Sequence, residues 1–126
     1  MKNIIVSKLD DSFVKFDSRI GNGIAIWSGE QISQGAFCEI ELDIEDYFEW
    51  GKNITLINEE KCNIRMHDNK LIFNAKIIFF ENDGVLTISL DDDVIFIEVS
   101  KADAITDGYV SFFTTPEKVM LYPVDL

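Results

Sequence analysis

The chain has 126 residues, enough for one domain with a buried core and too few for two domains of ordinary size. Hydrophobic residues make up 47% of it, including 10 Phe, 3 Tyr and 2 Trp, which excludes intrinsic disorder. Eleven Lys and Arg against 23 Asp and Glu give a formal net charge of −12, so nucleic acid and anionic membranes are not expected partners.

Period-two alternation of apolar and polar residues recurs along the chain, with turn residues every eight to twelve positions. This pattern is typical of antiparallel strands in a sandwich or barrel. The pairs Asn22-Gly23 and Asp68-Asn69 suit the positive φ of hairpin turns. We expect strands at residues 4–9, 13–17, 24–27, 36–45, 54–58, 62–67, 71–80, 85–90, 94–99, 109–114 and 119–122.

Two short segments favour helical turns. Residues 45–50 read equally well as one or two helical turns capped by Asp43 or as a strand, and both alternatives stay open. Ser100 with Asp103 predicts a helical turn over 101–105.

The expected strand at 71–80 places Leu71, Phe73, Ala75, Ile77 and Phe79 on one face. It becomes apolar on both faces toward its end, which suits a bent strand in a small barrel.

The order of elements over about residues 51–122 resembles small barrels of the OB or SH3-like type. It runs from a long strand through two further strands and a short helical turn to a closing strand that begins at Gly108-Tyr109-Val110. We therefore expect an all-β fold, a single small antiparallel barrel or sandwich with one or two short helical turns. The chain has no linker, repeat or low-complexity tract, so residues 1–126 are expected to form one β-rich domain.

The N-terminus holds an apolar run of only three residues, Ile4–Val6, which is too short for a secretion signal. No apolar run exceeds four residues, whereas a membrane helix needs about 18 or more. We expect a soluble, cytoplasmic protein in which Cys38 and Cys62 are reduced thiols. With one histidine and no CxxC, neither a metal nor a cofactor is expected.

The acidic residues are concentrated in two windows. Residues 38–50 and residues 81–98 each contain six acids and no Lys or Arg, and the rest of the chain holds 11 acids and 11 bases. Within the first window, Cys38, Ile40, Leu42 and Ile44 alternate with acids, so one strand face is core and the other is carboxylate.

Unrelieved carboxylates at this spacing repel one another, which invites a functional reason. We expect them to bind a basic protein as a substitute for phosphates. The alternative is that they form the solvated face of a strand and protect a sheet edge. The candidate partner-binding residues are Glu39, Glu41, Asp43, Glu45, Asp46, Glu49, Asp91, Asp92 and Asp93.

In its small size, acidity and aromatic content the chain is similar to bacterial immunity proteins that neutralise toxins, often nucleases. The resemblance implies a non-enzymatic inhibitor of a basic toxin domain. His67 is the only histidine and has no neighbouring serine or cysteine in sequence, which gives no reason to expect catalysis. Two other functions stay open: a module that self-associates through sheet edges, and a small carboxylate-dependent enzyme.

Overall fold

The computed structural model describes residues 1–30, 35, 37–81, 83–102, 105 and 107–124. These residues form an all-β fold, as the sequence predicts. Their one 3₁₀ turn, η1 (Pro116–Lys118), lies where no helical turn was expected. Among them there is no helix of the length and hydrophobicity needed to cross a membrane. The strands are β1 (Ile4–Lys8), β2 (Phe13–Ser18), β3 (Gly21–Trp27), β4 (Phe37–Cys38), β5 (Ile40–Ile44), β6 (Tyr47–Phe48), β7 (Ile54–Ile57), β8 (Asn63–His67), β9 (Lys70–Glu81), β10 (Val85–Leu90), β11 (Asp93–Val99), β12 (Tyr109–Thr114) and β13 (Val119–Pro123).

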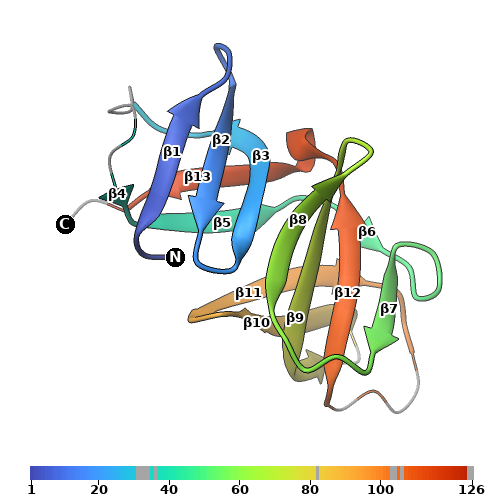
Figure 1. Ribbon diagram of the computed structural model, residues 1–126. Helices are drawn as coiled ribbons and strands as arrows, with labels where there is room; N and C mark the ends of the chain where they lie inside the picture. Colours follow the sequence, from blue (N-terminus) through green and yellow to red (C-terminus); the bar gives the residue numbers. More distant parts are fainter. Residues whose placement is uncertain (31–34, 36, 82, 103–104, 106, 125–126) are drawn as a thin grey trace.

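Strand pairing forms two circuits. In the first, β1, β2 and β3 form an antiparallel meander, β3 pairs in parallel with β13, and β13 pairs antiparallel with β5. β4 is separated from β5 only by Glu39 and pairs with β1, which completes the circuit. Figure 1 shows this group of strands at the upper left, with the N-terminus at its lower edge.

The second circuit is built around β9, the longest strand. β9 pairs with β8, β10 and β12, while β10 continues to β11 and β12 continues to β7. β11 pairs in parallel with the two residues of β6, and a bridge between Trp50 and Ile54 links β6 to β7. The sequence led us to expect antiparallel strands throughout. The structure corrects this expectation, because β3/β13, β3/β8 and β6/β11 are parallel pairs.

The buried apolar residues form one cluster that draws on both circuits. At its centre, the Phe48 ring packs edge-on against Phe112 and the Phe73 ring stacks on Phe112, each at 5.1 Å between ring centroids. These three residues come from β6, β9 and β12, so the core holds together segments that are far apart in sequence.

The hairpin expected at Asp68-Asn69 is present. Both residues have positive φ, 49° and 60°, and His67 pairs with Lys70 across the turn. The prediction of a turn at Asn22-Gly23 is wrong, because both residues lie inside β3.

The turn between β2 and β3 instead falls three residues earlier, at Arg19-Ile20, and Gly21 pairs with Ser18. A Cβ at Gly21 would lie 1.8 Å from the carbonyl oxygen of Ile64, and one at Gly23 would lie 2.4 Å from the Leu71 side chain. These glycines serve the close approach of β3 to β8 and β9.

Phe79 does not share the buried face of Leu71, Phe73 and Ala75. Thr87 pairs with Phe79 but the next residue, Ile88, pairs with Ile77, so Ile78 is an extra residue in β9. Such a bulge shifts the following side chains to the opposite face. Phe79 is accordingly 56% exposed, and Phe80 packs against the core in its place.

Neither segment that favoured a helical turn, 45–50 or 101–105, is helical in its described residues. Tyr47 and Phe48 form a strand, not a helical turn, because they pair with Glu98 and Val99. Part of the expected helical turn at 101–105 lies outside the described residues, and residues 101, 102 and 105 are not helical.

Candidate functional site: an acidic groove

The outward acids of β5 form a row. Ile40, Leu42 and Ile44 are buried, while Glu41, Asp43 and Glu45 are exposed, as the period-two pattern predicts. We call these three exposed acids the β5 row. Glu39 is half-buried and lies at the break between β4 and β5, where it accepts a backbone hydrogen bond from Val124 at 3.0 Å.

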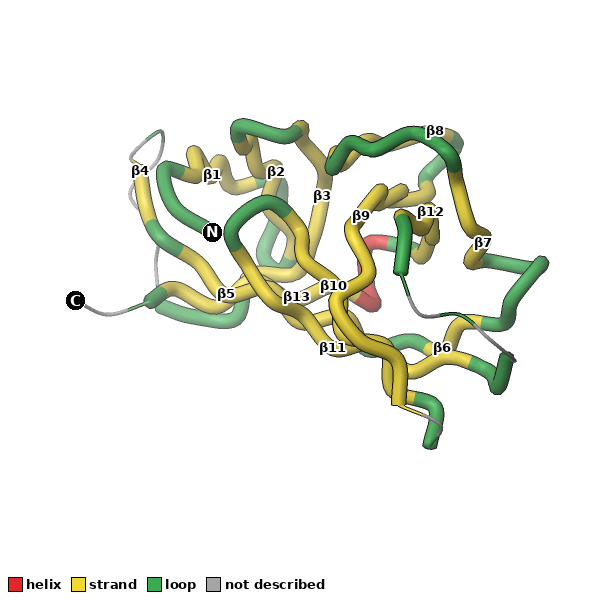
Figure 2. The backbone as a smooth tube through the Cα atoms, turned by 90° about the horizontal axis from the view of Figure 1, so that it is seen from below, coloured by secondary structure: helices red, strands yellow, loops and turns green. Residues whose placement is uncertain are grey.

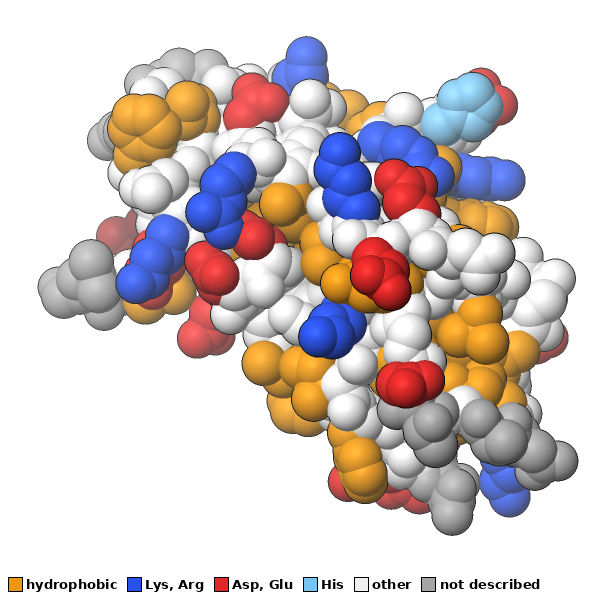
Figure 3. Space-filling view, turned by 60° about the horizontal axis from the view of Figure 1, so that its bottom comes forward, with side chains coloured by type: hydrophobic (Ala, Val, Ile, Leu, Met, Phe, Trp, Pro, Cys, Tyr) orange, Lys and Arg blue, Asp and Glu red, His pale blue; other side chains and the backbone are white. Residues whose placement is uncertain are grey.

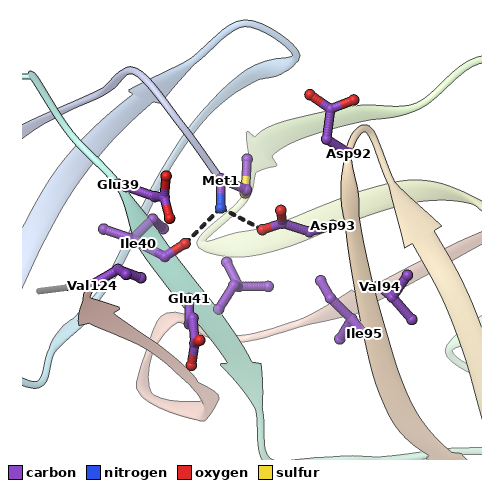
Figure 4. A pocket seen from close by; sticks show the side chains of 10 residues that line it. Met1, Glu39, Ile40, Glu41, Asp92, Asp93, Val94, Ile95 and Val124 are labelled. Carbon is purple, nitrogen blue, oxygen red and sulfur yellow. Dashed lines mark hydrogen bonds and ion pairs between the residues drawn. The ribbon is translucent and has the colours of Figure 1, made fainter. Parts of the chain in front are cut away.

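Two hollows lie one after the other between β5 and β11, and we call the pair of them the groove. Its first part is a hollow of about 430 Å³, and Figure 4 shows its lining residues, which come from both sides. The acids in this part are Glu39 and Glu41 from the β5 side and Asp92 and Asp93 from the β10–β11 side.

The second part is a hollow of about 520 Å³. Its acids are Asp43, Glu45 and Asp46, with Glu98 of β11 opposite. The fold therefore brings acids from both charge-rich windows of the sequence to one groove.

The groove has little positive charge to balance these acids. Among the described residues, no Lys or Arg lines either hollow. The amino group of Met1 lies in the first hollow, where it donates to the carbonyl oxygen of Ile40 and forms an ion pair with Asp93. Among the described residues, Glu39 and the β5 row make no ion pair. Other parts of the surface carry both signs of charge. On the face drawn in Figure 3, Lys and Arg (blue) are interspersed with Asp and Glu (red) over the upper part.

Asp91 and Asp92, in the turn between β10 and β11, face a base. The Arg19 guanidinium donates to Asp91 through Nε at 3.2 Å and through Nη2, and Nη2 lies 3.4 Å from Asp92. The bond to Asp91 raises the pKa of Arg19 above its usual value. Figure 2 shows the N-terminus beside the β10–β11 hairpin. The Arg19 contacts and the Met1–Asp93 ion pair therefore attach the turn to the first circuit.

Asp46 and Glu49 differ from the β5 row. Asp46 accepts hydrogen bonds from the Thr114 hydroxyl at 2.7 Å and the Tyr47 amide at 2.8 Å, so it supports the entry to β6 as well as lining the groove. Glu49 is exposed but does not line either hollow. Of the nine sequence-predicted residues, Glu49 and Asp91 are therefore not among those that the groove brings together.

Sequence reasoning missed the apolar wall of the groove. Val94 and Phe96 on β11 are 56% and 64% exposed and line the first and second hollow respectively. Ile95 and Ile97 are buried, whereas Val94 and Phe96 are exposed. Because all four residues are apolar, the sequence does not show this alternation between the two faces of the strand. The polar residues that follow at every second position, Glu98 and Ser100, were the available signal.

The described residues contain no group of three or more His, Cys, Asp or Glu side chains arranged to hold a metal ion. Cys38 and Cys62 are both free thiols and both half-buried. Burial raises the pKa of the Cys38 thiol, which keeps it protonated to higher pH than an exposed thiol.

Comparison of the chain with protein-family models, with curated proteins and with solved structures gives no match. The functional argument therefore depends on the groove itself.

Proposed function

We propose that the chain is a non-enzymatic binding protein whose acidic groove receives a basic protein. The observation that carries this proposal is the set of carboxylates in and beside β5 and β11 that line one groove, with no Lys or Arg among the described residues of its walls. Like charges held this close on a small protein cost free energy that interspersed bases normally relieve. A cationic partner would supply the missing countercharge on binding.

The groove also has the mixed character of a protein-binding surface. Phe96 and Val94 offer exposed apolar area beside the carboxylates. Protein interfaces are enriched in aromatic residues at their core, where apolar contact supplies affinity, and carry polar and charged residues at the rim, where charge supplies specificity and a faster association rate.

The partner chemistry follows from the spacing of the acids. Successive outward residues of a strand lie roughly 7 Å apart, which places the β5 row at intervals similar to those of backbone phosphates. A protein surface built to bind phosphates would find comparable anions here. We propose accordingly that the chain is an immunity protein that acts in the bacterial cytoplasm and inhibits a toxin, with a nuclease as the best fit to this charge pattern.

The test begins with the gene immediately upstream, where the proposal expects a secreted protein with a basic C-terminal toxin domain. Expression of that domain alone should stop growth, and co-expression of this chain should restore it. The catalytically inactive domain should bind the purified chain with an affinity that falls steeply as the salt concentration rises from 50 to 500 mM. Over this range the Debye length decreases from about 14 Å to about 4 Å, so charge–charge attraction is increasingly screened. Growth arrest that co-expression does not relieve, together with no measurable binding, would overturn the proposal.

A further inference from the structure

The groove is bordered by two strand edges that, in the part of the chain that the structure describes, have no pairing partner over their middle sections. β5 pairs with β13 on one side, and β11 pairs with β10 on one side and with β6 only at Glu98 and Val99. Among the described residues no ladder joins β5 to β11. Both strands run in the same direction (Figure 1), converging where β6 joins β11.

The printed register shows which backbone groups of β5 point into the groove. The amide of Glu45 donates to Lys118 and the carbonyl of Glu39 accepts from Val124, so these residues face β13. Because hydrogen-bonding direction alternates along a strand, Glu41 and Asp43 also face β13. The amides and carbonyls of Leu42 and Ile44 therefore face the groove.

The same reasoning applies to β11. The amide of Val99 donates to Gly84, so Ile97 and Ile95 direct their backbone groups to β10 as well. The amides and carbonyls of Val94 and Phe96 face the groove, opposite those of Leu42 and Ile44.

Met1 already shows how this edge accepts a residue. Its amino group donates to the carbonyl of Ile40, and the amide of Ile40 donates to the carbonyl of Met1 at 2.8 Å. This reciprocal exchange is the pattern of an antiparallel pair. One residue farther along, the edge of β5 has no such partner among the described residues.

We propose that an extended segment of the basic partner binds in the groove as an added strand between β5 and β11. This inference rests on the proposed function and specifies how the partner is held. Backbone hydrogen bonds to both edges would supply affinity, as in other cases of strand addition. The segment would run antiparallel to β5, as Met1 does, and would join the two strand circuits at a second place besides the β3/β8 pair.

The side chains around the groove define the segment's composition. Its outward residues would lie between the β5 row and the exposed Val94 and Phe96. Lys or Arg fits this position, because the aliphatic stem packs on the apolar wall while the charge reaches a carboxylate. Its inward residues would face buried Leu42 and Ile95 and are expected to be small and apolar.

The probe is the capped peptide Lys-Val-Lys-Val-Lys-Val, titrated into the whole chain. Two control peptides keep its composition and charge: Lys-Lys-Lys-Val-Val-Val, and the alternating peptide N-methylated at its two central amides, which removes one donor facing each strand. The alternating peptide should bind about tenfold more tightly than either control, since the controls lose alternation or hydrogen bonds. Amide hydrogen exchange should slow at Leu42, Ile44, Val94 and Phe96 and stay unchanged at Ile95 and Ile97, which already bond to β10.

Equal binding of all three peptides, with no added protection at those four amides, would overturn strand addition while leaving charge-driven docking in place. Failure of every peptide to bind would overturn strand addition too, and the upstream toxin domain would then decide the proposed function separately. If sedimentation shows that the chain alone dimerises and that its dimer protects the same four amides, a second copy occupies the groove and the basic partner segment is ruled out. Glu41→Gln with Asp43→Asn should weaken the alternating peptide without altering its exchange pattern at saturation.

Discussion

Two acidic segments meet at this groove, and they differ in what their carboxylates contact. In the β10–β11 turn, Asp91 and Asp92 face Arg19 and Asp93 pairs with the amino group of Met1. In the β5 row, Glu41, Asp43 and Glu45 make no ion pair with any described residue. The carboxylates of the turn attach the β10–β11 hairpin to the first circuit through Met1 and Arg19. The carboxylates of the β5 row remain able to pair with a cationic partner.

This difference shows that the number of acids in a segment is a poor guide to which acids can bind a partner. Both segments have the same excess of acids in the sequence. Only the structure shows that Arg19, more than 70 positions away from Asp91, neutralises one of them. Four experiments test the contrast between the β5 row and the turn.

The largest effect is expected from reversing the charge of the β5 row. Glu41→Lys, Asp43→Lys and Glu45→Lys together should weaken binding of the upstream toxin domain by about 100-fold or more, because bases would then face bases. The fold should survive, since all three side chains are exposed. Calorimetric titration measures the affinity, and circular dichroism the fold.

A matched control separates the position of the charge from its total. Asp17→Lys, Glu59→Lys and Glu60→Lys alter net charge equally at exposed sites outside the groove. This control should retain affinity within a few-fold at physiological salt, where the Debye length is about 8 Å. An equal loss in both triple variants would show that bulk charge, not the row, governs binding.

The next largest effect is expected at the apolar wall. Phe96→Ala should weaken binding about tenfold, roughly 1.4 kcal/mol. Its stability should change by about 0.5 kcal/mol or less, since the ring is mostly exposed. Phe79→Ala is the control, because Phe79 is similarly exposed beside the same residue, Thr87, but does not line the groove. Affinity that falls equally in both variants would place the partner on the outer face of β9–β11 instead.

A smaller effect is expected from Arg19→Ala. Removing this base leaves Asp91 and Asp92 unpaired but changes nothing in the β5 row. Affinity for the toxin domain should change by less than about twofold, and the melting temperature should fall slightly, as is usual for exposed ion pairs. A tenfold change of affinity in either direction would mean that Asp91 and Asp92 matter to binding as much as the β5 row does, and would contradict the contrast.

The smallest effect concerns a third kind of carboxylate, one held by backbone amides. Asp10 accepts from the amides of Ser12 at 2.9 Å and Phe13 at 2.8 Å, and the Phe13 and Ser12 bonds lower the pKa of Asp10. A lowered folded-state pKa gives stability that is present above the unfolded pKa and is lost as pH falls through the folded one. Asp10→Asn should therefore remove a small part of the loss of stability that urea titrations measure as pH falls below about 4. An unchanged slope in that range would show that the bonds do not hold in solution.

The sequence predicted the all-β class and the alternation of β5 because both depend on local periodicity. It did not predict the groove, since the approach of β11 to β5 is a tertiary arrangement. The same holds for β6, where local pattern was balanced between helix and strand and pairing with Glu98 and Val99 decided the outcome. Phe79 was misplaced because one inserted residue in β9 reverses the faces beyond it, and period-two reading has no means of detecting it.

If the chain is a binding protein of the proposed kind, its partner covers the groove between β5 and β11. Amide chemical-shift mapping of the labelled chain, with and without the catalytically inactive toxin domain, locates the covered residues. We expect the largest shifts in residues 40–46 and 93–98. Shifts concentrated in residues 63–76, on β8 and β9, with the groove unaffected, would contradict it.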